Sequence, residues 1–277
     1  MSESAPTSIS SVEARPAATV MLVRDATAGV EVFLMQRSAH GMFGGLHVFP
    51  GGKVDPSDHA ELWATNARGP DDVAASATLG LDAGGLSYWV ACIRECFEEA
   101  GILLALGPDG ETLRLHLPRV RARYETWRMR LNDGEADVLD AMCSEEKLRL
   151  ATDQLAYVSH WITPVNSPRR YSTRFFVARA PARQEALHDG HEAVDSSWIR
   201  PKDALERFHA GELKLISPTV KNLEAIVGYP TTEELLLAKR AIDPASIPTI
   251  VPRIISSDSE GFDEILDVVG HGGRLSG

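Results

Sequence analysis

Three glutamates have the clearest potential for chemistry: Glu95, Glu98 and Glu99, in the segment WVACIRECFEEAGI at 89–102. At about 100° per residue they fall within an arc of roughly 100° on one side of a helix. Like charges at this spacing destabilise a helix by some tenths of a kcal/mol per pair, and no lysine lies nearby. Two interpretations are open: a solvated acidic face, or a site for a hard divalent cation such as Mg²⁺ or Mn²⁺.

The helix that would carry these glutamates is predicted over 86–100. Its other side is apolar, with Ile93, Cys96, Phe97 and Ala100, so we expect that side to be anchored in a core. Gly101 is a typical left-handed residue at the end of a helix. Upstream, the glycine-rich segment 41–52 surrounds a short predicted strand over 46–49, and its backbone is expected to pack closely against a ligand or another strand.

The remaining pattern predicts a mixed β-sheet between helices, an α-β-α sandwich of the α+β class. The first two strands, 17–24 and 30–37, flank the turn-like segment 25–29 and are predicted to form a hairpin. Further strands are predicted over 157–162, 173–180 and 193–198, and further helices over 119–131, 135–150, 204–210, 218–227 and 233–240.

We divide the chain into a disordered tail (1–15), one domain (16–241) and a C-terminal extension (242–277). The extension has a short apolar run over 247–255. The domain contains two insertions. The first, at about 55–85, is rich in Asp, Ala, Gly, Ser and Thr and has one short helix near 60–65, and the second covers about 119–150.

Composition limits the classes of function. The 28 basic and 39 acidic residues give a formal net charge of −11, which disfavours a broad nucleic-acid footprint. Three cysteines are too few for a disulfide framework, so we interpret Cys92, Cys96 and Cys143 as core-facing thiols. No signal-peptide pattern and no stretch of about 18 apolar residues is present. We therefore expect a cytoplasmic protein without membrane contact; a homodimer is an open alternative to a monomer.

Two segments together resemble the Nudix box, Gly-x5-Glu-x7-Arg-Glu-U-x-Glu-Glu-x-Gly-U, where U is a bulky apolar residue. The second half matches from Arg94 to Ile102 if Cys96 counts as apolar. The first half begins at Gly52, and Asp58 stands at the position of the family's glutamate. Between Asp58 and Arg94 lie 35 residues instead of seven. A Nudix subgroup related to peroxisomal acyl-CoA diphosphatases carries a long insertion at this place.

That subgroup is also similar to this chain in three other segments: 36–38 (QRS), 47–52 (HVFPGG), and 161–176 with WITP and PRRYSTRFF. The resemblance implies a metal-dependent hydrolase that cleaves a diphosphate linkage, in CoA or acyl-CoA. Segments 33–38 and 48–52 match the CoA-directed signature in part, with one residue fewer between Ser38 and Phe49 and with Met42 in place of its second arginine. Two alternatives are open: another nucleoside diphosphate derivative as substrate (ADP-ribose, a dinucleoside polyphosphate or an NAD-type dinucleotide), or a non-catalytic nucleotide-binding module.

The resemblance also implies roles for individual residues. Arg94 would pair with an acid of the loop, for which Asp58 is the candidate. The general base would be a glutamate of the helix (Glu98 or Glu95) or Glu192 in a later loop. The metal, Mg²⁺ or Mn²⁺, would be bound by Glu95, Glu98, Glu99 and the carbonyl of Gly51. Because guanidinium groups bind phosphate in a forked geometry, the candidate substrate-binding residues are Arg37, Ser38, Arg170 and Arg174.

Overall fold

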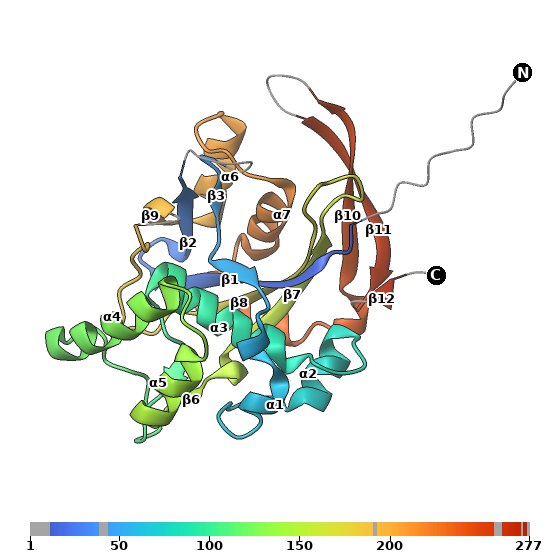
Figure 1. Cartoon of the computed structure of the whole chain (residues 1–277). Helices are drawn as coiled ribbons and strands as arrows, with labels where there is room; N and C mark the ends of the chain where they lie inside the picture. The colour runs from blue at the N-terminus through green and yellow to red at the C-terminus, as the bar shows by residue number, and fades with distance from the viewer. Residues whose placement is uncertain (1–11, 39–43, 191–192, 258–261, 273, 276–277) are drawn as a thin grey trace, which may run out of the picture.

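The computed structural model describes residues 12–38, 44–190, 193–257, 262–272 and 274–275. Within these residues a ten-stranded mixed sheet runs through the molecule (Figure 1). In spatial order its strands are β12 (Arg274–Leu275), β11 (Phe262–His271), β10 (Pro248–Ser257), β7 (Ala156–Ile162), β8 (Tyr171–Arg179), β1 (Arg15–Ala26), β2 (Gly29–Arg37) and β3 (His47–Val48), while β4 (Gly51–Lys53) pairs with β1 and β9 (Ala193–Ile199) pairs with β2.

The two sides of the sheet are covered by different helices (Figure 1). Because successive side chains of a strand point to opposite faces, β1 contributes Val20 and Leu22 to one apolar cluster and Met21 and Val23 to the other. The first cluster packs against α1 (Ala60–Trp63), α2 (Asp72–Leu79), α3 (Leu86–Ala100), α4 (Pro118–Asn132) and α5 (Val138–Glu146). The second packs against α6 (Pro201–His209), α7 (Ser217–Ile226) and α8 (Thr232–Arg240). The predicted sandwich is confirmed.

The predicted hairpin is present, with Val23 opposite Val32 in antiparallel β1 and β2. The centre of the sheet was not predicted: β1 pairs in parallel with β8, from Arg15 opposite Tyr171 to Val23 opposite Arg179. Arg15, assigned to the disordered tail by sequence, is the first residue of β1. Residues 1–11 of that tail lie outside the described residues.

Both insertions differ from the sequence prediction in part. The first contains a second helix, α2, which was not predicted because its sequence consists mostly of small residues without a clear apolar period. Its signals were a capping aspartate, Asp71, whose carboxylate accepts a hydrogen bond from Ala74 N–H, and left-handed Gly80 at its end. In the second insertion the predicted helix over 135–150 is too long. It ends at Glu146, because Lys147 adopts a positive φ, and Arg149–Leu150 form β6, paired with β5 (Ala105–Leu106).

The C-terminal extension continues the sheet. The apolar run becomes β10, which pairs in parallel with β7 through Thr249 opposite His160 and Ile250 opposite Trp161. The strands β10 and β11 form a long antiparallel hairpin at the side of the molecule (Figure 1). Across the described ranges, the helices lack the combination of length and apolar character needed to cross a bilayer.

Candidate active site

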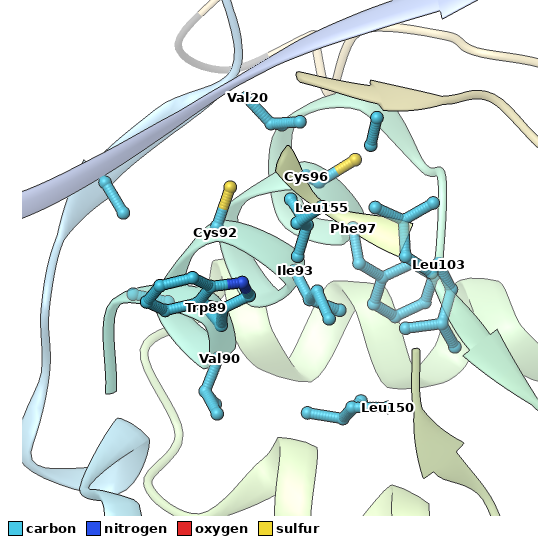
Figure 2. Packing of buried hydrophobic residues seen from close by; sticks show 14 of the residues in the cluster. Val20, Trp89, Val90, Cys92, Ile93, Cys96, Phe97, Leu103, Leu150 and Leu155 are labelled. Carbon is cyan, nitrogen blue, oxygen red and sulfur yellow. The ribbon is translucent and has the colours of Figure 1, made fainter. Parts of the chain in front are cut away.

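Helix α3 is the element that positions the three glutamates. Its 15 residues follow the predicted boundaries and end at Gly101, with φ +67°. Trp89, Ile93, Cys96 and Phe97 are buried in the first apolar cluster, as Figure 2 shows. This burial turns the opposite side of the helix toward β4, so that the acidic arc faces the glycine-rich turn. Cys92, Cys96 and Cys143 are buried free thiols, as predicted.

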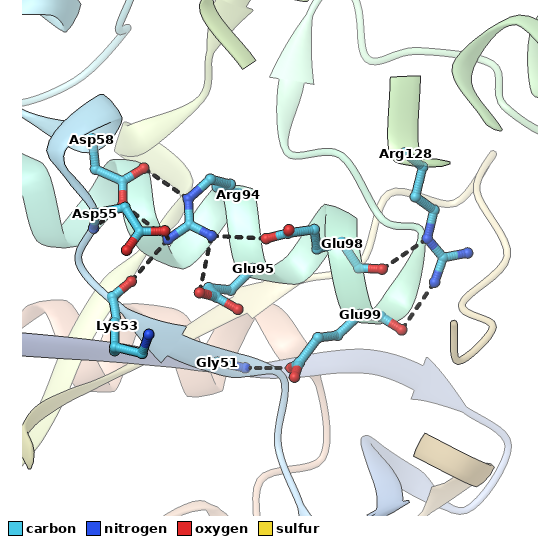
Figure 3. A network of polar contacts seen from close by, with 9 residues as sticks. All are labelled: Gly51, Lys53, Asp55, Asp58, Arg94, Glu95, Glu98, Glu99 and Arg128. Atoms are coloured by element: carbon cyan, nitrogen blue, oxygen red, sulfur yellow. Dashed lines mark hydrogen bonds and ion pairs between the residues drawn. The ribbon is translucent and has the colours of Figure 1, made fainter. Parts of the chain in front are cut away.

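Arg94 is the centre of the polar network (Figure 3). Its Nε and Nη2 donate to the two carboxylate oxygens of Asp58, both at 2.9 Å, and Nη2 also donates to the Lys53 carbonyl at 2.8 Å. Both partners are buried, with Asp58 0% and Arg94 5% exposed. The predicted pair is confirmed, and it ties the loop after β4 to α3 across the insertion.

The same guanidinium reaches two of the glutamates. Arg94 Nη1 donates to Glu95 at 2.9 Å and to Glu98 at 2.7 Å. Burial disfavours the charge of Arg94, but hydrogen bonding to Asp58 and the charge of Glu95 outweigh it and raise the pKa of the arginine. Arg94 is therefore a permanent cation between these carboxylates.

Glu99 points to the glycine turn. Its Oε2 accepts a hydrogen bond from Gly51 N–H at 2.7 Å (Figure 3). A Cβ on Gly51 would come within 2.6 Å of the Ala18 carbonyl oxygen, and one on Gly52 would overlap the Glu95 carboxylate. The absence of side chains at these two glycines is what lets the turn lie against the acidic side of α3.

The acidic side of α3 is thus no solvated face. The side chains of Glu95 and Glu98 are 13% and 18% exposed, and Glu99 is 7% exposed. Desolvation raises the pKa of Glu95 and of Glu98, and the opposing charge of Arg94 does not cancel it. Four carboxylates, those of Asp55, Asp58, Glu95 and Glu98, surround the Arg94 guanidinium, and Glu99 adds a further one on the same side of the helix. This excess of partly buried negative charge fits an additional hard cation.

No three His, Cys, Asp or Glu side chains of the described residues are arranged as a closed metal site. Arg94 Nη1 lies between Glu95 and Glu98 and donates to both. A cation bound by both would have to take the place of this N–H group, while the Nε and Nη2 contacts to Asp58 could persist.

The four candidate substrate residues fall into two groups. Arg37 is the last residue of β2, opposite Ala193 of β9, and Ser38 follows directly after the strand. Side chains of a strand alternate between its two faces, so Arg37 lies on the same face as Phe33 and Met35, which is the face covered by α3. Arg170 and Arg174 instead lie on β8 or just before it.

In this structure Arg170 and Arg174 have protein partners. Arg170 donates to the backbone carbonyls of Thr163 and Val12 at 3.1 and 2.8 Å, which holds the chain ahead of β1. Arg174 is 2% exposed because its strand lies in the middle of the sheet, and its Nη1 lies 3.5 Å from the Tyr157 hydroxyl. Its guanidinium is therefore closed to a substrate phosphate in this structure.

Glu192, the later candidate for the base, lies outside the described residues. The segment that precedes it packs on the end of α3: Leu187 N–H donates to the Ala100 carbonyl at 3.0 Å, and the Gln184 amide pairs with both backbone groups of Leu103. The chain leading to Glu192 therefore starts beside the acidic helix.

Arg128 on α4, which no motif in the sequence indicated, donates to the backbone carbonyls of Glu98 and Glu99. Its position in the predicted helix 119–131 could have indicated that it is buried. Arg128 follows Tyr124 by four residues and precedes Leu131 by three, so it lies on the buried side of the helix.

The acidic helix, the glycine turn and the Arg94–Asp58 pair define a Nudix domain. Comparison of the chain with known proteins agrees with this assignment. The crystal structure of a Nudix hydrolase from Alicyclobacillus acidocaldarius matches with a TM-score of 0.66 at 29% identity, covering 82% of this chain and 96% of that one. The family model for the NUDT19 Nudix domain matches residues 71–226, more than half of the chain. The chain belongs to the NUDT19 Nudix domain family.

Among the curated relatives, three have the name acyl-coenzyme A diphosphatase NUDT19. The Xenopus laevis protein is 26% identical over 239 residues, which cover 76% of this chain and 63% of the relative. The Homo sapiens protein is 27% identical over 240 residues, covering 75% and 63%. The matched part of this chain thus spans less than two thirds of the length of these relatives.

Proposed function

We propose that this chain is a divalent-metal-dependent hydrolase that cleaves the diphosphate linkage of CoA or acyl-CoA, giving 3′,5′-ADP and a 4′-phosphopantetheine product. The observation that carries the proposal is the placement of the three glutamates: Glu95 and Glu99 lie against the Gly51–Gly52 turn, and Glu98 lies beside Glu95 on the Arg94 guanidinium. The curated relatives of this domain are named acyl-CoA diphosphatases. The partial match of 33–38 and 48–52 to the CoA-directed signature adds to it.

The residues of the acidic helix would hold the metal, Mg²⁺ or Mn²⁺. Glu95, Glu98 and Glu99 supply carboxylate oxygens, which these ions prefer, and Gly51 would supply its carbonyl. When bound, such an ion neutralises charge on the diphosphate and lowers the pKa of an attacking water. When the metal binds, the Arg94–Asp58 pair would hold the loop after β4 in place against α3.

The proton of the attacking water needs an acceptor. Glu98 and Glu95 are suited to this role because burial raises the pKa of each carboxyl, which strengthens a carboxylate as a base. Glu192 is the alternative. Arg37 and Ser38 are the candidates for binding the substrate. They lie at the end of β2, and strand alternation places Arg37 on the face of the sheet that α3 covers.

The proposal is tested by assaying CoA, an acyl-CoA and ADP-ribose with Mg²⁺, with Mn²⁺ and with chelator, and by identifying both products. We expect CoA compounds to be cleaved preferentially and only with added metal. Glu98→Gln should abolish turnover without unfolding the protein, while the control Glu61→Gln, at an exposed position of α1, should keep it. Turnover in chelator, or equal turnover of ADP-ribose and CoA, would contradict the proposal.

A further inference from the structure

The last turn of α3 has unusually complete hydrogen bonding at its carboxyl end. The last four carbonyls of a helix have no partner within the helix, and here the end is buried, with Ala100 and Ile102 both 0% exposed. Gly101 N–H donates to the Phe97 carbonyl and Leu187 N–H to the Ala100 carbonyl, each at 3.0 Å. The two carbonyls between them, those of Glu98 and Glu99, are bonded by a side chain.

That side chain is Arg128, from the second insertion. Its Nε donates to the Glu98 carbonyl and its Nη2 to the Glu99 carbonyl, both at 2.9 Å (Figure 3). Nη2 also donates to the Leu187 carbonyl at 2.9 Å. The residue is 5% exposed, and an arginine stays charged even when buried. A cation here also faces the negative end of the helix dipole.

The two residues whose backbone Arg128 holds are both predicted metal ligands. From this single turn their side chains separate. Glu98 reaches Arg94 at 2.7 Å, and Glu99 reaches Gly51 N–H, also at 2.7 Å. A change in the winding of this turn would move both carboxylates at once, because each follows its own backbone.

We propose that Arg128 is a positioning residue: it fixes the last turn of α3 so that Glu98 and Glu99 can bind one metal ion together. The inference rests on the proposed function for the identity of the metal ligands. It also assigns a use to the second insertion, whose helix α4 supplies this side chain. Through Leu187, the same guanidinium ties the turn to the segment that leads to β9.

Loss of the guanidinium should therefore weaken metal binding. Residues that orient metal ligands without touching the ion typically contribute 10–100-fold in affinity. We expect Arg128→Met to lower Mn²⁺ affinity by this factor. Arg128→Lys should show a smaller loss, because an ammonium group is a point charge without the planar fork that reaches several carbonyls. The matched control is Arg130→Met on the same helix, where an exposed arginine bonds to Glu135.

The experiment is a titration of the full chain with Mn²⁺ in which electron paramagnetic resonance counts the free ion, accompanied by circular dichroism and thermal unfolding. It needs no substrate. If the wild-type chain binds Mn²⁺ but cleaves no CoA compound, the proposed substrate fails and the role of Arg128 is still measured. If the wild type binds no Mn²⁺, the metal site fails, and this inference with it.

Among folded variants, the proposal predicts weaker Mn²⁺ binding for Arg128→Met and unchanged binding for Arg130→Met. Wild-type affinity in folded Arg128→Met would overturn it. If that variant does not fold, Arg128→Lys decides: a folded Lys variant with reduced affinity supports positioning, and one with wild-type affinity overturns it. Failure of both variants to fold would assign Arg128 to the stability of the fold alone and would also overturn the proposal.

Discussion

The buried pair of Arg94 and Asp58 offers a quantitative test of how the interrupted motif is held together. Asp58→Ala removes two hydrogen bonds to the guanidinium, both 2.9 Å long, and the one from Asp55 N–H. Loss of one partner from a buried ion pair costs about 3–5 kcal/mol. Since Arg94 would keep Glu95, Glu98 and the Lys53 carbonyl, we expect the lower end, about 3 kcal/mol.

For a chain of this size, about 3 kcal/mol corresponds to a fall in melting temperature of roughly 6–12 °C. The free energy of unfolding is measured by urea titration and the melting temperature by calorimetry. Asp55→Ala is the control, because Asp55 is 49% exposed and lies 3.6 Å from Arg94. It should cost less than about 1 kcal/mol. If the two variants lose stability equally, the argument that burial makes the Asp58 pair strong is refuted.

Three further outcomes are expected. Gly52→Ala should weaken Mn²⁺ binding about tenfold or more, because its Cβ would displace the Glu95 carboxylate; titration as above checks it, and wild-type affinity would contradict it. Burial and the charge of Arg174 lower the pKa of His160 to about 2, so below pH 6.5 only the unfolded chain takes up this proton. Stability should then fall by at most about 1.4 kcal/mol per pH unit on acidification, and urea titrations between pH 6.5 and 4 should show a shallower loss for His160→Gln. Finally, because burial raises the pKa of all three thiols, a thiol reagent should modify native protein far more slowly than urea-unfolded protein at Cys92, Cys96 and Cys143.

Local sequence signals predicted the parts of this molecule that depend on local physics. The period of apolar residues placed α3 to the residue, and the motif placed Asp58 beside Arg94 although 35 residues separate them. The side of α3 that carries Glu99 could be inferred from helix geometry alone. Its contact with Gly51 could not, since it depends on how closely β4 approaches.

Contacts between distant segments escaped prediction for a physical reason. The pairing of Thr249 with His160 and the bonds from Arg128 to α3 depend on packing, which no short window of sequence encodes. The burial of Arg174 could not be predicted either. A cluster of basic residues in sequence does not reveal that Arg174 lies in a central strand, under Tyr88 and Tyr157. Glu192 stays a prediction.

The parallel pairing of β1 with β8 can form only late in the synthesis of the chain. Arg15 meets Tyr171, 156 residues later in the chain, and at about 5–20 residues per second a ribosome needs roughly 8–30 s to make that stretch. During this interval the first hairpin has an unpaired edge and no neighbour on that side. Until residues 171–179 are made, this edge presents unpaired backbone N–H and C=O groups that can pair with another chain.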